Sequence, residues 1–391
     1  MSDDPERQAN QLLQCLTQDK KPLGFLLGAG CPYSIKLKSN TPLIPDIRGL
    51  TEIVGKEVCC MDAKEPWEKT CSQLIEDGTD KPDIEDILSR VRGLKDLAGS
   101  GDVRGLSKAV LEELEKTICK EIVKCVSKKL PDKSTPYHNL ASWIGSIGRT
   151  HPVEIFTTNY DLLTEQALED LRIPFFDGFV GARQPFFDAH AIEFDNLPAR
   201  WARLWKIHGS INWRSTDAVD GFKVWRTDVE KGGDVVIHPS HLKYEQSRKM
   251  PYLAMMDRLK KFLSTSSSAL IVVGYSFRDQ HLNDTIIQSL QGTPSAAVFA
   301  LMHGPLSNYS IGVKLARERG NLSILAADGA VSGTKEQIWK EMEEKPDTIL
   351  PGGAVEWKKG SKEENPWRAC FKLGDFYSFG ALLQDISGKI I

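Results

Sequence analysis

Four short apolar runs in this 391-residue chain are each followed by small or polar residues of the kinds that bind nucleotides or transfer protons. These residues are Gly28-Ala29-Gly30, Thr158-Asn159-Tyr160-Asp161, His208-Gly209 and Gly274-Tyr275-Ser276. Glycine lets a backbone approach a phosphate closely, and an Asn amide hydrogen-bonds a sugar hydroxyl or water without carrying charge. A histidine titrates near neutral pH and can act as a general base. The pattern indicates a nucleotide site with Asn159 and His208 as candidate catalytic residues.

Each group also has a purely structural interpretation, which the sequence leaves open. The glycines could form a plain tight turn, Asn159 and Asp161 could cap a turn or a helix, and His208 could be a structural histidine. The dinucleotide fingerprint of oxidoreductases requires a third glycine three residues after Gly30, where Tyr33 stands. This departure disfavours a nicotinamide-dependent oxidoreductase.

The apolar runs predict strands that are buried on both faces, because they are short and do not alternate with polar residues. The runs cover 24–27, 153–156, 203–207 and 269–273, with further strands expected at 296–301 and 322–326. Helical patterns separate them at 161–171, 251–263, 279–290 and 311–319. This alternation predicts an α/β fold with a Rossmann-like open, mostly parallel sheet. Because ligands bind at the carboxyl ends of such strands, all four polar groups should meet at one edge.

The remaining segments predict additions to this sheet. Residues from about 58 to 135 carry helical patterns and are interpreted as a helical insertion, whereas 178–200 and 214–234 are expected to be loops. The sheet domain with its insertion is expected to span 1–326, and a C-terminal extension follows at 327–391. The extension is rich in aromatic residues, which either complete the core or form an oligomer or partner contact. They are Trp367, Phe371, Phe376, Tyr377 and Phe379.

The composition excludes several classes of protein. A net charge of −3 provides no broad basic surface, so nucleic acid contact is expected only through a partner. The longest apolar run, 269–273, is far shorter than the roughly 20 residues that span a bilayer, and the polar N-terminus does not form a signal peptide. We therefore expect a cytoplasmic protein without membrane contact. The eight cysteines contain no C-x-x-C pair, so no metal site is expected.

In this order, the four groups resemble the sequence motifs of sirtuins. Gly28-Ala29-Gly30 with Ser34 resembles the GAG-x-S element, and Pro45-Asp46-Ile47-Arg48 resembles G-I-P-D-F-R. Thr158-Asn159-Tyr160-Asp161 resembles T-Q-N-x-D, His208-Gly209 resembles the catalytic H-G, and Gly274-Tyr275-Ser276 resembles G-T-S. The resemblance covers residues 24 to about 290 of the chain.

Departures from the sirtuin pattern are informative. The chain lacks the four-cysteine zinc ribbon of protein deacylases, and a helical insertion takes the place of the small domain. Ser34 lies four residues after Gly30, displaced from its position in the motif. The Tyr of T-N-Y-D, the segment His238-Pro239-Ser240 and the G-Y-S-x-x-D pattern are similar to sirtuin-like subunits of bacterial antiphage systems. The length and the Leu373-Gly374-Asp375-Phe376 tail resemble the sirtuin-like partner of a HerA-type ATPase.

The resemblance implies an NAD glycohydrolase that releases nicotinamide and ADP-ribose, in abortive-infection defence by NAD depletion. Asn159 would hold a ribose hydroxyl and water, His208 would accept a proton, and Asp161 would orient one of them. The NAD-binding residues would be Gly28, Ala29, Gly30, Ser34, Asp46, Arg48, Thr158, Gly274 and Ser276. A homo-oligomer docked on a HerA-type ring ATPase is also implied. The alternatives are an NAD-dependent protein deacylase and a non-catalytic scaffold subunit that senses NAD or ADP-ribose.

Overall fold

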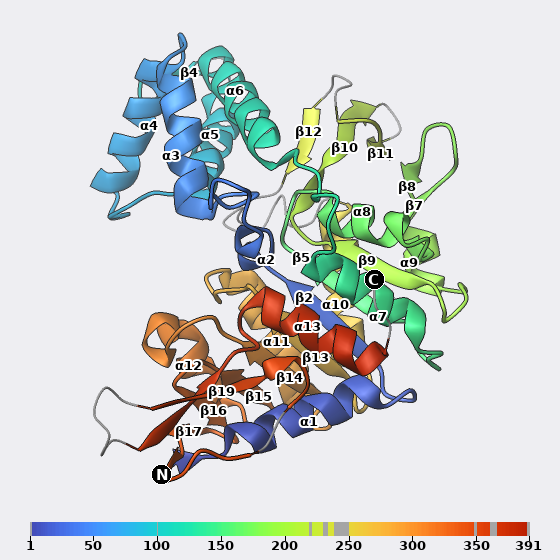
Figure 1. Cartoon of the computed structure of the whole chain (residues 1–391). Coiled ribbons are helices and arrows are strands. Elements are labelled where there is room, and N and C mark those ends of the chain that lie inside the picture. The colour runs from blue at the N-terminus through green and yellow to red at the C-terminus, as the bar shows by residue number, and fades with distance from the viewer. Residues whose placement is uncertain are drawn as a thin grey trace.

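A ten-stranded sheet forms the centre of the molecule (Figure 1). The structure is a computed structural model, and it describes residues 2–99, 101–218, 221–229, 234–237, 250–347, 350–359 and 366–388. In spatial order the strands are β1 (Ser2–Asp3), β17 (Lys335–Trp339), β16 (Gly329–Ser332), β15 (Leu322–Leu325), β14 (Ala297–Leu301), β13 (Ala269–Val273), β2 (Leu23–Leu27), β5 (Glu154–Thr157), β9 (Ala202–Lys206) and β6 (Phe175–Phe176). From β15 to β6 every neighbouring pair is parallel, and only β16 pairs antiparallel with its neighbours. The predicted Rossmann-like, mostly parallel sheet is confirmed.

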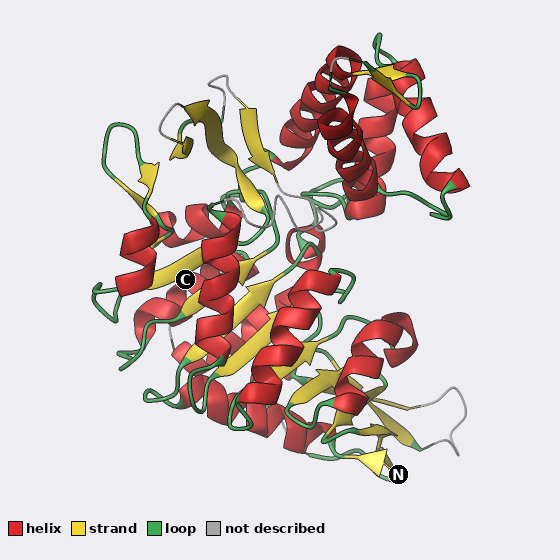
Figure 2. Cartoon of the chain, turned by 180° about the vertical axis from the view of Figure 1, so that it is seen from behind, coloured by secondary structure: helices red, strands yellow, loops and turns green. Residues whose placement is uncertain are grey.

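Helices cover both faces of this sheet (Figures 1 and 2). One face packs around Phe25 and Leu27 and is covered by α1 (Pro5–Thr17), α7 (Pro136–Ser146), α8 (Leu163–Asp170) and α13 (Phe376–Ser387). The other packs around Leu26 and Val272 and is covered by α9 (Ala189–Phe194), α10 (Tyr252–Leu263), α11 (Gln280–Gly292) and α12 (Ser310–Glu318). All residues of β2 and β13 are buried, because successive side chains of a strand point to opposite faces and both faces are covered.

A helical bundle interrupts the sheet domain between β2 and β5. After the short α2 (Gly30–Ser34), it comprises α3 (Ile47–Cys59), α4 (Lys64–Glu76), α5 (Ile84–Ala98) and α6 (Lys108–Val126), with the small hairpin β3 (Asp102–Val103) and β4 (Leu106–Ser107). Side chains cap the starts of α3, α5 and α6, most completely at Asp83, which forms a capping box with Asp86. The fold therefore contains the expected helical insertion, and its first helix begins at Ile47, earlier than the expected position of about 58.

A second, five-stranded antiparallel sheet contradicts part of the sequence-based prediction. Its order is β12 (Asp234–Ile237), β10 (Gly209–Ala218), β11 (Gly221–Arg226), β8 (Phe186–Phe187) and β7 (Phe179–Val180). The expectation of loops at 178–200 and 214–234 is therefore wrong. The two longest strands of this sheet, β10 and β11, contain Arg, Ser, Thr and Lys, so they lack the continuous apolar run that marks the central strands. The bundle and this second sheet both lie beyond the carboxyl ends of the central strands (Figures 1 and 2).

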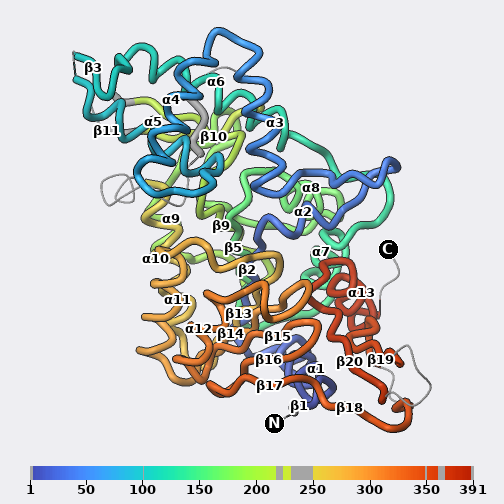
Figure 3. Tube along the Cα trace, turned by 90° about the vertical axis from the view of Figure 1, so that its left-hand side faces the viewer, coloured from blue at the N-terminus to red at the C-terminus, as the bar shows by residue number. Residues whose placement is uncertain are grey.

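The C-terminal extension closes one face of the molecule. Its first two strands, β16 and β17, belong to the central sheet. They are followed by β18 (Glu341–Met342), the 3₁₀ turn η2 (Pro351–Gly353), β19 (Val355–Lys359), β20 (Trp367–Phe371) and α13, whereas the 3₁₀ turn η1 (Leu306–Tyr309) lies before α12. Helix α13 lies beside α7 (Figure 3), with the rings of Tyr137 and Phe376 5.0 Å apart. Phe371, Phe376 and Phe379 are buried in the core. Three of the five aromatic residues in the tail thus complete the core.

Candidate functional site

The four polar groups singled out in the sequence follow four adjacent strands. Strands β13, β2, β5 and β9 are neighbours in this order and run parallel, so their carboxyl ends lie side by side. The chain passes from β2 to β5 on one side and later returns to β13 on the other side. The boundary between β2 and β13 is the kind of topological switch point where open α/β sheets bind ligands. The structure thus places the four groups along one edge.

Two glycine-containing loops touch each other at this switch point. The backbone N–H of Gly28 donates to Val273 O (2.9 Å), and that of Gly30 donates to Gly274 O (2.9 Å). A Cβ atom on Gly28 would lie 2.3 Å from Gly274 O, and Gly274 has a φ of +70°. Close packing of the loops therefore already requires these glycines. Ala29 and Gly30 remain exposed, so their backbone is reachable by a ligand.

Asn159 is fixed against the glycine loop of β2. Its side-chain Nδ2 donates to Gly28 O (3.1 Å), and its backbone N–H donates to the Thr157 hydroxyl (3.0 Å). The neighbouring Thr158 donates its backbone N–H to Leu27 O (3.2 Å). Thr158 and Asn159 are both half-buried. These bonds orient the Asn159 amide and join the ends of β2 and β5.

Asp161 caps the first turn of α8. Its carboxylate accepts the backbone N–H of Leu163 (3.0 Å), and Lys206 Nζ donates to its backbone carbonyl. Lys206 also pairs with Glu165 at 2.9 Å. Burial raises the pKa of Asp161 to about 6, although the charge of Lys206 opposes this shift. Its hydrogen bonds support the cap interpretation that the sequence left open.

His208 is held by an acidic partner that the sequence analysis did not identify. His208 Nε2 lies 2.8 Å from the Oδ2 atom of Asp279, and both side chains are buried. Burial alone would lower the pKa of His208, but the hydrogen bond and charge of Asp279 outweigh it and raise the pKa. Burial would likewise raise the pKa of Asp279, yet the bond to His208 lowers it. This arrangement engages Nε2 and leaves Nδ1 as the nitrogen that can accept a proton.

Asp279 is itself fixed by its own helix. It is the N-cap of α11 and accepts the backbone N–H of Leu282 (3.0 Å) through Oδ1. In the same turn, the Tyr275 hydroxyl donates to the side-chain oxygen of Asn283 (2.8 Å). The carboxylate that orients His208 therefore comes from the loop after β13, which also carries Gly274.

A buried hydroxyl without a hydrogen-bond partner lies near Asn159. Tyr137 of α7 is 2% exposed, and its hydroxyl makes no hydrogen bond of acceptable geometry. Burial raises its pKa, with further influence from Asp161, Cys31 and Asn159, which places the hydroxyl among these groups. An unsatisfied buried hydroxyl is costly unless water or a ligand completes it. No feature of the sequence distinguishes Tyr137 from other core aromatic residues.

The helical bundle contacts the loop that carries Asn159. The Tyr160 hydroxyl donates to Glu85 Oε1 of α5 (3.0 Å), and the Tyr160 ring lies 6.4 Å from that of His208. The Tyr160 carbonyl accepts the backbone N–H of Ile211 (3.1 Å) from β10. Tyr160 thus joins the bundle, the central sheet and the second sheet.

The other predicted NAD-binding residues are more dispersed. Asp46 caps α3 by accepting the backbone N–H of Gly49 (2.9 Å), and Arg48 is exposed on the first turn of that helix. The Ser34 hydroxyl donates to Cys31 O (2.7 Å), and Ser276 is exposed after Gly274. In the described residues no hydrogen bond joins Asp46, Arg48, Ser34 or Ser276 to Asn159 or His208. The segment 238–240 lies outside the described residues.

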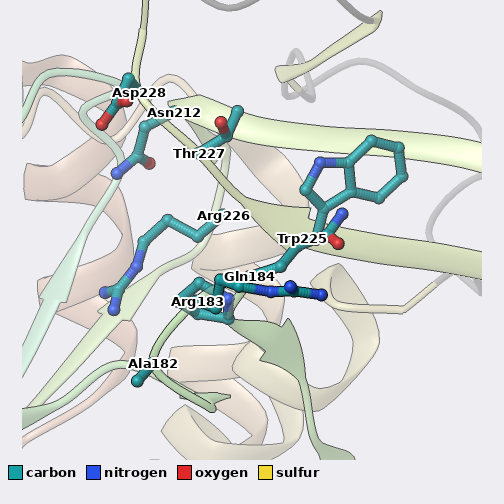
Figure 4. A pocket seen from close by; sticks show the side chains of 9 residues that line it. Ala182, Arg183, Gln184, Asn212, Trp225, Arg226, Thr227 and Asp228 are labelled. Atoms are coloured by element: carbon teal, nitrogen blue, oxygen red, sulfur yellow. The ribbon is translucent and has the colours of Figure 1, made fainter.

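A cavity of about 710 Å³ lies in the second sheet, apart from these groups (Figure 4). It is lined by the loop 182–185, by Asn212 of β10 and by residues 225–228. Arg226 is tied down by an ion pair with Asp177. None of the residues predicted from the sequence lines this cavity.

Three comparisons relate the chain to known proteins. Residues 153–321 match the model of the SIR2-like domain, and this segment carries Asn159, His208 and Gly274. Residues 153–321 are thus similar to this domain. No curated protein sequence matches the chain. A solved structure described as "Structural Basis for the Mechanism and Regulation of Sir2 Enzymes" is 13% identical, with 76% of this chain and 86% of that chain covered and a TM-score of 0.34. The fold assignment rests on the sheet topology.

Two properties bear on other functions. Among the described residues, no helix is both long and apolar enough to span a membrane. In the same part of the chain, no group of three or more His, Cys, Asp and Glu side chains is placed to hold a metal ion. All eight cysteines are free thiols.

Proposed function

We propose that this protein is an NAD glycohydrolase that hydrolyses the bond between nicotinamide and ribose. The observation that carries the proposal is the placement of Asn159 and the His208–Asp279 pair on adjacent strands, beside two touching glycine loops. The SIR2-like match over 153–321 supports NAD as the substrate. The exposed backbone at Ala29 and Gly30 and the unpaired Tyr137 hydroxyl fit a polar ligand at this edge.

In the proposed reaction, water attacks the ribose carbon and the bond to nicotinamide breaks. The bonding electrons pass to the nicotinamide nitrogen, which neutralises its positive charge, so this leaving group needs no acid. The attacking water loses a proton to His208 Nδ1, and Asp279 stabilises the resulting imidazolium. Asn159 would hold a ribose hydroxyl and orient the water. Asp161, which caps α8, would position this loop rather than touch the substrate.

The NAD-binding roles of the remaining residues belong to the same proposal. Ala29 would offer its exposed backbone N–H to the pyrophosphate, and Gly28, Gly30 and Gly274 would let the backbone come close to it, because they carry no side chain. Ser276 would contact the adenosine ribose. Arg48 could reach a phosphate because its guanidinium is exposed. Ser34, Asp46 and Thr158 would support these loops, since each already makes a local backbone hydrogen bond.

The test is to incubate the purified full-length chain with NAD, with and without an acetylated peptide, and to measure nicotinamide. Release without peptide supports the glycohydrolase. Release that requires peptide assigns the chain as a deacylase instead. NAD binding without any release of nicotinamide would contradict both enzymatic assignments.

A non-catalytic NAD-sensing scaffold is the second candidate, because His208 is only 4% exposed. A histidine this buried and ion-paired can serve the fold alone. Binding of NAD without nicotinamide release, both alone and with its partner, would favour this candidate.

The biological setting proposed here follows from the motif resemblance. The chain would be the NAD-depleting subunit of a cytoplasmic antiphage system, a homo-oligomer docked on a HerA-type ring ATPase, with nucleic acid contacted only by that partner. Light scattering of the chain alone and with a HerA-type ATPase tests the assembly. A monomer under both conditions would contradict it.

A further inference from the structure

A second cluster of charged side chains surrounds a cavity at the opposite, amino-terminal edge of the central sheet. The cavity has a volume of about 310 Å³ and lies beside Val153 and Ala202, where β5 and β9 begin. Its basic lining residues are Arg149, His151, Arg172 and Arg200. The described residues that line it include no Asp or Glu. Four basic groups thus converge on one hollow from three segments of the chain.

The floor of this cavity is apolar. Ile144 and Ile147 of the α7 end contribute to it, together with Ile173 and Pro174. An apolar floor with a few converging polar groups is typical of small-molecule sites. The surroundings suit a ligand that has an anionic group and a smaller apolar or planar part.

Arg149 is the most firmly held of the four basic residues. Its Nη1 donates to Gln18 O (2.8 Å) and its Nη2 to Leu16 O, at the end of α1, and its guanidinium lies 4.7 Å from the centre of the Trp143 ring. Its Nε is buried and has no hydrogen-bond partner. Burial lowers the pKa of Arg149, and the charge of Asp19 opposes this shift. The backbone hydrogen bonds and the Trp143 ring fix the guanidinium beside the cavity.

Arg172 occupies a backbone position that favours glycine. Its φ is +55°, and it follows the last turn of α8. Arg172 N donates to Glu169 O (2.9 Å) and Ile173 N to Leu168 O (2.8 Å), the hydrogen bonds of a helix end with a left-handed residue. A side chain at this φ costs backbone energy that glycine would avoid, so the turn itself gives no reason for an arginine. We attribute the arginine to its guanidinium, which lines the cavity.

The outer basic residues of the cluster lack partners. Among the residues that the structure describes, His151, Arg172 and Arg200 have no ion pair, and all three side chains are exposed. Like charges around one cavity repel one another unless an anion neutralises them. Arginines that converge from different segments match the tetrahedral oxygens of phosphate better than a single carboxylate.

We propose that this cavity binds a small phosphate-bearing anion. The ligand would sit at the beginning of β5 and β9, whose other ends carry Asn159 and His208. It would therefore occupy a site separate from the one described above. A volume of about 310 Å³ favours a small molecule over a macromolecular phosphate chain.

The test is calorimetric titration of the full-length protein with inorganic phosphate, pyrophosphate and ADP at one fixed salt concentration. Arg172→Gly and Arg200→Ala should each weaken binding of these probes at least about tenfold, because each removes a charge-assisted contact. Arg172→Gly should not lower the melting temperature, since glycine suits the backbone. The matched control is Arg104→Gly, an arginine with φ +50° in the distant β3–β4 hairpin, which should leave binding unchanged. Because the proposed NAD site would also take a pyrophosphate, only the part of the binding that Arg172→Gly or Arg200→Ala removes is assigned to this cavity.

The titrations separate the sources of the phosphate. Tighter binding of ADP than of pyrophosphate, with the excess lost in Arg172→Gly, assigns the apolar floor to a nucleotide base. Equal binding of the two assigns the site to an inorganic anion. Absence of binding by all three probes would overturn the proposal, as would equal weakening in Arg172→Gly and Arg104→Gly. A changed oligomeric mass in Arg172→Gly without anion binding would also overturn it and assign the cluster to contact between copies.

Discussion

Asn159 and His208 contribute different chemistry to the proposed reaction. Single substitutions distinguish the catalytic role of each residue from its structural role. Asn159→Ala removes the amide that the Gly28 carbonyl orients, and His208→Ala removes the base. Each should lower nicotinamide release at least about a hundredfold, a typical loss for such groups. Circular dichroism should show that the fold survives. Turnover near the wild-type rate in either folded variant would contradict the assignment.

The His208–Asp279 pair predicts a specific pH dependence. A base works only when it is deprotonated, so the raised pKa of His208 places the acid limb of activity above the ordinary histidine value of about 6.5. Asp279→Asn preserves the helix cap but removes the charge. We expect the acid limb of nicotinamide release to move to lower pH and the maximal rate to fall.

Stability provides a second measurement of the same pair. The raised pKa of His208 stabilises the fold fully below about pH 6.5, and this contribution is lost as the pH rises through the raised value. Asp279→Asn should therefore reduce the free energy of unfolding most at mildly acidic pH. The control is Asp46→Asn, which changes an exposed helix cap on α3. Identical pH profiles for wild type and Asp279→Asn would exclude the pair from both roles.

Tyr137 and Tyr275 form a matched pair for testing the unsatisfied hydroxyl. Tyr275→Phe breaks a bond to Asn283 and should cost about 1 kcal/mol of unfolding free energy. Tyr137→Phe breaks no hydrogen bond of acceptable geometry and removes only a contact with the Asn159 side chain, so it should cost little. If the Tyr137 hydroxyl holds water or substrate beside Asn159, its removal should still slow nicotinamide release. Chemical denaturation and turnover of both variants give the answer, and loss of stability in Tyr137→Phe would contradict the prediction.

The residues that the sequence could locate share a local signature. Asn159 and His208 directly follow apolar strands, and strand ends of an open sheet meet at one edge. Asp279 lies six residues after its strand, where its cap of α11 explains it equally well. Tyr137 and Glu85 come from helices that reach the site only through tertiary packing. No periodicity or motif within their own segments could assign them.

At the scale of elements, a hydrogen bond between Tyr160 and Glu85 couples the bundle to the loop after β5. Tyr160→Phe removes the donation to Glu85 on α5 and leaves the buried ring in place. Because a hydrogen bond to a charged group contributes about 1.5–3 kcal/mol, the loop should open more often. We expect faster hydrogen exchange at 158–161 and a lower kcat, with the KM for NAD nearly unchanged.

The control for this substitution is Tyr309→Phe. It removes a hydroxyl that donates to His303 O, away from the site. If Tyr160→Phe affects exchange and kcat no more than this control does, the bundle does not position the catalytic loop.

The two sheets show which elements a sequence pattern reveals. Strands β2 and β13 are buried on both faces and produce continuous apolar runs. Strand β10 instead alternates Ile211 and Trp213 with polar residues and buries Arg214, whose guanidinium donates to three backbone carbonyls. A buried arginine whose hydrogen bonds go to backbone carbonyls gives no apolar signal. The sequence therefore predicts loops where the second sheet forms.

At the scale of the whole molecule, the C-terminal aromatic residues divide into core and surface. Phe376 is buried against Tyr137, whereas the adjacent Tyr377 is 36% exposed. Gly380 lets α13 approach α7, because a Cβ there would lie 2.9 Å from Pro136. Truncation after about residue 350 would remove this whole layer and expose the sheet face. It would therefore test the fold rather than the proposed assembly.

Single substitutions at these two adjacent positions test the fold and the assembly separately. Phe376→Ala should lower the free energy of unfolding by about 3–5 kcal/mol, because it leaves a cavity between α13 and α7. Tyr377→Ala should cost less than about 1 kcal/mol and should reduce the oligomeric mass if α13 contacts another copy or the ATPase. Urea unfolding and light scattering measure the two effects on the same samples. Equal destabilisation by both variants would show that Phe376 and Tyr377 are buried to the same extent, which would contradict the prediction. An unchanged mass in Tyr377→Ala would place the contact between subunits elsewhere, because Tyr377 is the exposed aromatic residue that α13 offers to a partner.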